Sequence, residues 1–320
     1  MSVLLEKLLE PLARFYDQPD VLEIRMSEPC KLNLVRRDND TELIDAPELT
    51  IRSISLICKA LANYNKKKFD PDNNPSLYAM LPPGHRFTCL VGPSVVKGVS
   101  MTIRVKHPYE IKLEDMGLCA EAIAYICEAL QKQWNIVISG SAFTGKTTLL
   151  NCLLKHVPAD RRIISAEDTP EIDMNKFHQG VSLLANREVE PGTGEQTWSQ
   201  LFAHKMRSSP DNIIFGEISE QNAKAALSAI NSGAKGWMCT IHAESAKYVP
   251  VRFEDYIHSA GQNAGDVQKY MRQLVDLVIH IRRTEKRGRY VAELYEMKND
   301  KYVMEDGKFL SGGNVIPFNS

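Results

Sequence analysis

One eight-residue stretch determines how the second half of this chain is interpreted: Gly140-Ser141-Ala142-Phe143-Thr144-Gly145-Lys146-Thr147. It follows an apolar run at residues 136–138 and precedes a helical run at residues 148–154. A strand, a glycine-rich turn and a helix in this order point successive backbone N–H groups at an anion, which the helix dipole also favours. The stretch therefore predicts a phosphate-binding loop, whereas the alternative is an ordinary glycine turn of an α/β fold.

The last positions of this loop predict its ligands. In a loop of this pattern the lysine reaches the β- and γ-phosphates, and the hydroxyl that follows binds Mg²⁺. Lys146 and Thr147 occupy these two positions. We therefore expect ATP and Mg²⁺ as cofactors, with Mg²⁺ on Thr147 and the nucleotide held by Gly140, Ser141, Ala142, Phe143, Thr144, Gly145, Lys146, Thr147 and Thr148.

Length and composition limit the possible classes of protein. The chain has 320 residues, a formal net charge of -1, 43% hydrophobic residues and 25% charged residues. Because single cores seldom grow past roughly 250 residues, this length predicts one large and one small domain. The composition excludes a disordered or fibrous protein. Without a long block of Lys and Arg, we expect no direct binding of nucleic acid.

The cysteines and the amino terminus indicate the compartment. The seven cysteines are scattered without a Cys-x-x-Cys pair, which predicts buried thiols in a reducing compartment and no zinc or redox motif. Residues 1–10 carry acids within an apolar pattern and predict an amphipathic helix, not a signal peptide. No apolar run approaches the roughly 20 residues that span a bilayer. We expect a cytoplasmic protein, peripheral to the inner membrane through its partners.

The first hundred residues predict a small α+β domain. Alternating runs at residues 21–26 and 31–35 predict a β-hairpin, and residues 49–64 predict a helix. Residues 87–91 and 99–105 read as further strands. We place this amino-terminal domain at residues 1–106 and a polar linker, which begins with His107-Pro108-Tyr109, at residues 107–117.

From residue 118 onward, short apolar runs alternate with longer helical patterns, which is typical of a parallel α/β domain. The runs lie at residues 135–139, 162–166, 212–215, 237–241 and 277–281. All strands of a parallel sheet present their carboxyl ends at one edge, so side chains that follow these runs are expected to meet there.

A triphosphate site needs acids that hold magnesium and orient the attacking water. Residues 212–215 lead to Glu217, as a Walker B segment leads to its acid, and we expect Glu217 to be the general base or to order the water ligands of magnesium. Residues 162–166 lead to Glu167 and Asp168. Either of these two acids could polarise the water, and the other would then be structural.

The run at residues 237–241 delivers His242. A lone histidine is often an ordinary loop residue, but as a donor at this edge it could sense the γ-phosphate.

With these four segments in order, the chain resembles the secretion ATPase superfamily, which includes type II secretion, type IV pilus and VirB-type conjugation ATPases. The Walker A, Asp box, Walker B and His box of that superfamily correspond to residues 140–147, 167–171, 207–217 and 233–242. Arg207, which begins the third segment, is a further candidate. The resemblance covers nearly the whole chain and implies a RecA-like P-loop domain at residues 118–320 that follows the smaller α+β domain.

The resemblance also implies roles for individual residues. Residues 81–86 and 100–104 look like the family segments whose arginines reach nucleotide phosphates, which implies that Arg86 and Arg104 bind nucleotide. The catalytic candidates are Lys146, Glu167, Glu217 and His242.

Within the superfamily, the compact length, the lack of a tetracysteine insertion and residues 274–282 look most like the VirB-type branch of type IV secretion systems. That branch implies a homohexameric ring that hydrolyses ATP to power pilus assembly or substrate transfer, with membrane-associated secretion proteins as partners. The pilus and type II secretion motors are the alternatives, because they share every nucleotide-binding segment.

Two positions depart from the family pattern. Ser219 stands where an arginine usually follows the Walker B glutamate, and Ala234 stands where the His-box turn usually has a histidine. These departures keep a slow ATPase or a nucleotide-bound scaffold among the alternatives. A DNA-translocating motor would need a basic channel loop or an added DNA-binding domain, and the near-neutral composition indicates neither clearly. A small-molecule or nucleoside kinase would need an acceptor pocket and a lid, and the amino-terminal domain with its arginines fits a ring motor better.

Overall fold

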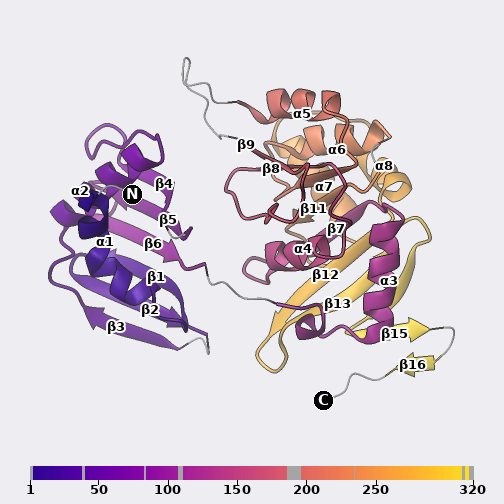
Figure 1. The fold of residues 1–320 in the computed structure, drawn as a ribbon, viewed down its shortest axis with the longest axis horizontal. Coiled ribbons are helices and arrows are strands. Elements are labelled where there is room, and N and C mark those ends of the chain that lie inside the picture. The colour runs from indigo at the N-terminus through magenta and orange to yellow at the C-terminus, as the bar shows by residue number, and fades with distance from the viewer. Residues whose placement is uncertain are drawn as a thin grey trace. The chain divides into compact units, whose positions relative to one another are not determined.

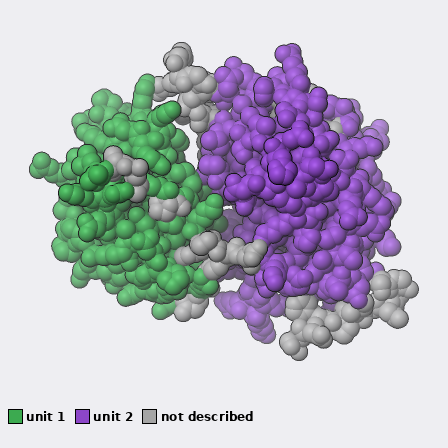
Figure 2. Space-filling view, viewed as in Figure 1, with its two compact units in different colours: residues 1–110 green, residues 111–320 purple. Residues whose placement is uncertain are grey.

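The computed structural model describes residues 3–37, 40–82, 84–106, 111–185, 196–233, 235–311 and 314–316. The chain divides into two compact units, Met1–Glu110 and Ile111–Ser320, which Figure 2 distinguishes by colour. Each unit has a hydrophobic core of its own. No helix among the described residues is both long enough and apolar enough to cross a membrane.

The first unit is a six-stranded antiparallel sheet with two helices, in the order β3-β2-β1-β6-β5-β4. Its core lies between the helices and one face of the sheet, where alternate residues of β5 and β6 are buried, among them Phe87 and Ile103, together with Ile24 of β1. The predicted hairpin is confirmed, since Ile24 pairs with Leu34 across its two strands. The elements are α1 (Val3–Tyr16), β1 (Val21–Glu28), β2 (Lys31–Arg36), β3 (Thr41–Asp45), α2 (Ile51–Tyr64), β4 (Ser76–Met80), β5 (Arg86–Val91) and β6 (Val99–Arg104).

The second unit contains a ten-stranded sheet in the order β16-β15-β14-β13-β12-β7-β11-β10-β8-β9 (Figure 1). Neighbours from β12 to β9 are parallel, and neighbours from β12 to β16 are antiparallel. The strands are β7 (Ile136–Gly140), β8 (Ile163–Glu167), β9 (Val181–Leu184), β10 (Asn212–Phe215), β11 (Met238–Ile241), β12 (Leu277–Thr284), β13 (Gly288–Glu296), β14 (Lys301–Glu305), β15 (Lys308–Ser311) and β16 (Asn314–Ile316). The five predicted apolar runs are therefore β7, β8, β10, β11 and β12.

Helices cover both faces of this sheet, so the second unit has two core layers. Ile136 and Ile138 of β7 pack with α3 (Ala120–Gln131) and α4 (Lys146–Leu154), whereas Val137 packs on the opposite side. That side is covered by α5 (Trp198–Arg207), α6 (Ala223–Asn231), α7 (Val249–Ser259) and α8 (Val267–Leu274). A strand buried on both faces reads as a continuous apolar run, which is why these strands were recognisable in the sequence.

Residues 111–117, which were expected to be part of the linker, belong to the second unit. Leu113 and Met116 are buried in the core of the second unit, and a 3-10 helix, η1 (Glu114–Met116), ends at Gly117 with φ 73°. Two apolar side chains three positions apart lie on the same side of such a turn, and both point inward. Residues 107–110 lie outside the described residues.

Candidate nucleotide site

The strand order brings the predicted site segments to one edge of the sheet. β7, β11, β10 and β8 are consecutive, parallel neighbours, so the loops after them leave from the same edge. Because β11 lies between β7 and β10, the loop with His242 lies between the phosphate loop and the loop with Glu217.

The phosphate loop folds around two glycines and one hydroxyl. A Cβ on Gly140 would lie 2.5 Å from the carbonyl oxygen of Ile281, so no larger residue fits there. Gly145, at φ 96°, precedes the first residue of α4 and has a conformation that disfavours any side chain. The hydroxyl of Thr144 is buried and donates to the carbonyl oxygen of Ser141 at 2.9 Å. The loop thus wraps the amino terminus of α4, as an anion-binding loop requires.

Lys146, His242 and Glu217 form a continuous chain of polar contacts. The Lys146 ammonium donates to the Ser141 carbonyl oxygen at 3.1 Å and lies 3.2 Å from Nδ1 of His242. Nε2 of His242 lies 2.5 Å from Oε1 of Glu217. Because an ammonium only donates, Nδ1 is the acceptor and Nε2 carries the proton that the carboxylate accepts. Three predicted catalytic residues are therefore in direct contact.

The turn that carries Glu217 is held by buried polar groups absent from the predictions. The side chain of Asn222 donates to the Glu217 carbonyl oxygen at 2.8 Å and accepts the Ser219 N–H at 2.9 Å. Thr240 of β11 donates through its hydroxyl to the carbonyl oxygen of Gly216 at 2.6 Å. The position of Glu217 therefore depends on its own turn and on the neighbouring strand β11.

Glu167 is buried and holds the turn that follows β8. Its Oε2 accepts the N–H groups of Glu171 and Ile172 at 2.8 and 3.0 Å. A Cβ on Gly216 would lie 2.8 Å from Cγ of Glu167, so this glycine makes room for the carboxylate beside the Glu217 turn. Asp168, by contrast, is exposed. These contacts favour a structural role for Glu167.

Residues 74–305 match the family model described as Type II/IV secretion system protein. The chain belongs to this family. It is 26% identical over 341 residues to the type IV secretion system protein VirB11 of Bartonella quintana, covering 92% of this chain and 93% of that one. It is 31% identical over 312 residues to the probable conjugal transfer protein TrbB of Sinorhizobium fredii, covering 94% of this chain and 91% of that one.

Solved structures share the fold of this chain. The pilus retraction motor PilT with bound ADP superposes with a TM-score of 0.61 at 17% identity, covering 92% of this chain and 83% of that one. The predicted RecA-like domain with a smaller α+β amino-terminal domain is confirmed, as is the predicted membership of the secretion ATPases.

The arginine candidates lie elsewhere. Arg207 is exposed at the end of α5, before β10. The neighbouring Ser208 lies near the start of β8, because Nε of Arg162 donates to the Ser208 carbonyl oxygen at 2.7 Å. Arg207 is thus on the side of the amino ends of the strands, opposite the phosphate loop. Arg86 and Arg104 belong to the first unit, where they pair directly across β5 and β6 on the face away from the helices.

Two residues near the phosphate loop carried no sequence signal. His280 of β12 is buried, and its Nδ1 lies 2.9 Å from the hydroxyl of Ser139 on β7. Burial, reinforced by the charges of Arg282 and Lys146, lowers the pKa of His280 to about 4. Arg289 of β13 donates through Nε to the carbonyl oxygen of Phe143 at 3.1 Å. Only the strand order, in which β12 pairs with β7 and β13 pairs with β12, reveals either contact.

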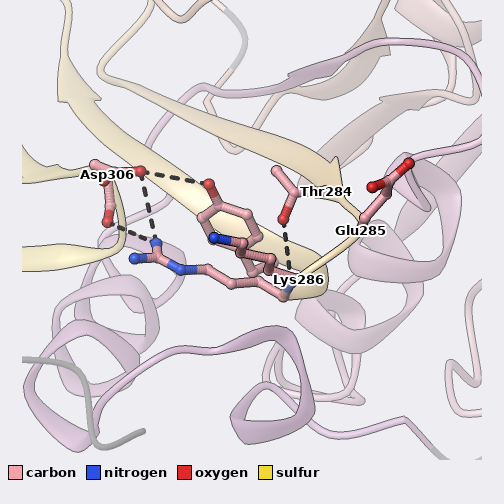
Figure 3. A pocket seen from close by; sticks show the side chains of 6 residues that line it. Thr284, Glu285, Lys286 and Asp306 are labelled. Atoms are coloured by element: carbon pink, nitrogen blue, oxygen red, sulfur yellow. Dashed lines mark hydrogen bonds and ion pairs between the residues drawn. The ribbon is translucent and has the colours of Figure 1, made fainter.

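A hollow of about 510 Å³ lies at the tip of the β12–β13 hairpin (Figure 3). Arg287 is one of the residues that line it, with its guanidinium 5.2 Å from the ring centre of Tyr290 and 3.6 Å from Asp306. The hollow does not include the Lys146, His242 and Glu217 chain, and its lining is Thr284, Glu285, Lys286, Arg287, Tyr290 and Asp306.

Proposed function

We propose that this chain binds ATP with Mg²⁺ at the carboxyl edge of the parallel sheet and hydrolyses it to drive a type IV secretion or conjugation system. The chain of contacts from Lys146 through His242 to Glu217 carries the proposal. The Lys146 ammonium is suited to bind phosphate, and the Glu217 carboxylate is suited to activate water. The His242 side chain connects them, because it contacts both.

The loop would hold the nucleotide phosphates through its backbone N–H groups and the Lys146 ammonium. Magnesium fits the donors present, because Mg²⁺ prefers oxygen ligands and usually keeps several waters. The hydroxyl of Thr147 would hold it at the first turn of α4, and the carboxylate of Glu217 would order its waters. When bound, the ion neutralises charge that develops on the phosphates.

Glu217 is the proposed general base. Its carboxylate would orient the attacking water and accept one of its protons. The His242 N–H on Oε1 fixes the orientation of this carboxylate, and the contact of Lys146 with Nδ1 ties that imidazole to the phosphate side of the site. If Lys146 moved toward a γ-phosphate, its contact with His242 would change, and with it the hydrogen bond from His242 to Glu217. Glu167 is the other candidate base, although two backbone N–H groups already use its Oε2.

The proposed assembly is a homohexamer that works with membrane-associated secretion proteins at the cytoplasmic face of the inner membrane. The names of the VirB11 and TrbB relatives, each matched over more than nine-tenths of its length, support a place in a type IV secretion or conjugation system. Arg86 and Arg104 of the first unit would contact nucleotide phosphates, and Asp168 is kept as a further candidate at the nucleotide. Arg207 is not proposed there, because it lies at the opposite edge of the sheet.

The test is phosphate release by the purified chain, with its size measured with and without ATP and magnesium. Lys146→Ala should lower turnover about 100-fold or more, because no other group supplies that charge inside the loop. Lys155→Ala, at the other end of α4, is the matched control and should hydrolyse normally. Turnover by a folded Lys146→Ala variant at the parental rate would contradict the site assignment, and an active protein that stays monomeric would contradict the ring.

A further inference from the structure

A bulge in strand β13 changes which of its residues face each side of the sheet. His280 of β12 pairs with Glu293, but the next residue, Ile281, pairs with Val291, so β13 has one extra residue there. Val291 packs in the core layer of α4, whereas Tyr295 packs in the layer of α7. Since strand side chains alternate, Glu293 shares the side of Tyr295. β13 therefore presents a carboxylate toward the segment before α7.

Glu293 is a buried carboxylate whose two oxygens are both used. Oε2 accepts the backbone N–H of Ala246 at 2.9 Å, and Oε1 accepts from the guanidinium of Arg282. Only 4% of the residue is exposed, so the charge is compensated almost entirely by these partners. The backbone that it binds belongs to residues 242–248, named here the histidine loop because it begins with His242.

Lys247, the residue after Ala246 in the histidine loop, contacts the β13–β14 hairpin. The Lys247 ammonium lies 3.1 Å from Asp300, and it stands 5.4 and 5.2 Å from the ring centres of Tyr295 and Tyr302. Through Ala246 and Lys247, four and five residues after His242, the loop thus contacts β13, β14 and the turn between them. Its other end makes the contacts to Lys146 and Glu217.

We propose that Glu293, compensated by Arg282, is a positioning residue that holds the histidine loop so that His242 bridges Lys146 and Glu217. The inference rests on the proposed function, because it gives His242 a place in ATP hydrolysis. Glu293 acts through the Ala246 N–H and not on the reacting atoms. Catalytic groups misplaced by about 1 Å can cost roughly 100-fold in rate, so a buried anchor this close to His242 affects turnover.

The test compares Glu293→Gln with Asp276→Asn. Asp276 is a matched control, because its carboxylate also accepts a backbone N–H, from Asn135 at 2.8 Å, and pairs with a cation, Lys298. It precedes β12 and therefore lies at the opposite edge of the sheet. Glu293→Gln should lower kcat for ATP about ten- to hundredfold with less change in KM, while Asp276→Asn should leave kcat within about twofold.

A double-variant comparison separates positioning from general loss of structure. In a His242→Ala background, adding Glu293→Gln should lower kcat less than about twofold, because the residue through which Glu293 acts is absent. An equal loss in both backgrounds, or an equal loss in Asp276→Asn, would overturn the inference.

Hydrogen exchange gives a readout that needs no hydrolysis. Glu293→Gln should speed exchange of amides in peptides that cover residues 242–248 about tenfold, and Asp276→Asn should not. If Glu293→Gln does not fold, Arg282→Ala takes its place, since the Arg282 side chain is 42% exposed. Unchanged exchange in the histidine loop would overturn the inference. A parental protein that hydrolyses no ATP would instead overturn the proposed function, while the exchange result would still decide this inference.

Discussion

The buried pair of His280 and Ser139 makes the second unit sensitive to acid. Burial and the nearby charges of Arg282 and Lys146 lower the pKa of His280 from 6.5 to about 4. An unfolded chain binds a proton at this histidine below pH 6.5, whereas the folded chain binds it only below about pH 4. Between these two pH values the unfolded state binds more protons than the folded state. The free energy of unfolding therefore keeps its full value above pH 6.5 and decreases as the pH falls toward 4.

The size of this effect follows from the two pKa values. Their difference corresponds to about 3 kcal/mol once the folded histidine is also protonated. Between pH 8 and pH 5 the same values give a loss of about 2 kcal/mol. The charge cannot relax into solvent, because His280 is only 2% exposed.

The measurement is urea unfolding at pH 8 and pH 5, followed by tryptophan fluorescence. Trp134, Trp198 and Trp237 are the only tryptophans and all belong to the second unit, so the signal reports on that unit alone. His280→Asn should reduce the loss of unfolding free energy between the two pH values by about 2 kcal/mol. The exposed His258→Asn is the control and should keep the parental difference. An identical pH dependence in His280→Asn and the parent would refute the reasoning.

The remaining predictions concern the nucleotide. Glu217→Gln should keep ATP affinity and stop turnover, since the amide hydrogen-bonds but accepts no proton; normal turnover there, with loss in Glu167→Gln, would exchange the two roles. Arg104→Ala should weaken ATP about tenfold and ADP much less, the size expected for one charged hydrogen bond to a terminal phosphate, as measured by titration with labelled nucleotides. Arg25→Ala, on the same sheet face and paired with Glu23, should change neither affinity, and equal losses for both nucleotides would leave Arg104 a structural residue.

The sequence predicted those parts of the candidate site that local chemistry determines. The strand, glycine turn and helix of the proposed phosphate loop were recognisable because they are contiguous in the chain. The strand-end residues Glu217 and His242 were recognisable because parallel strands end at one edge.

The order of the strands could not be predicted, and it decides which of those residues touch. Placement of β11 between β7 and β10 makes His242 a bridge from Lys146 to Glu217. Glu167 shows the opposite case, since only the fold reveals that Oε2 accepts backbone N–H groups. Long-range partners such as Glu293 and Ala246, 47 positions apart, leave no pattern that one sequence displays.

Ser219, where the family usually has an arginine, affects the backbone geometry of the Glu217 turn and the available side-chain contacts differently. The turn after Glu217 is fixed by Asn222, whose side chain accepts the Ser219 N–H, and by the Ser219 carbonyl oxygen, which accepts the N–H groups of Asn222 and Ala223. All these contacts use the backbone at position 219, so they form with any ordinary residue there. The geometry of Glu217 therefore does not require the arginine that the family usually has. Any change in rate that follows from Ser219 must come from the contacts of an arginine side chain beyond its own turn.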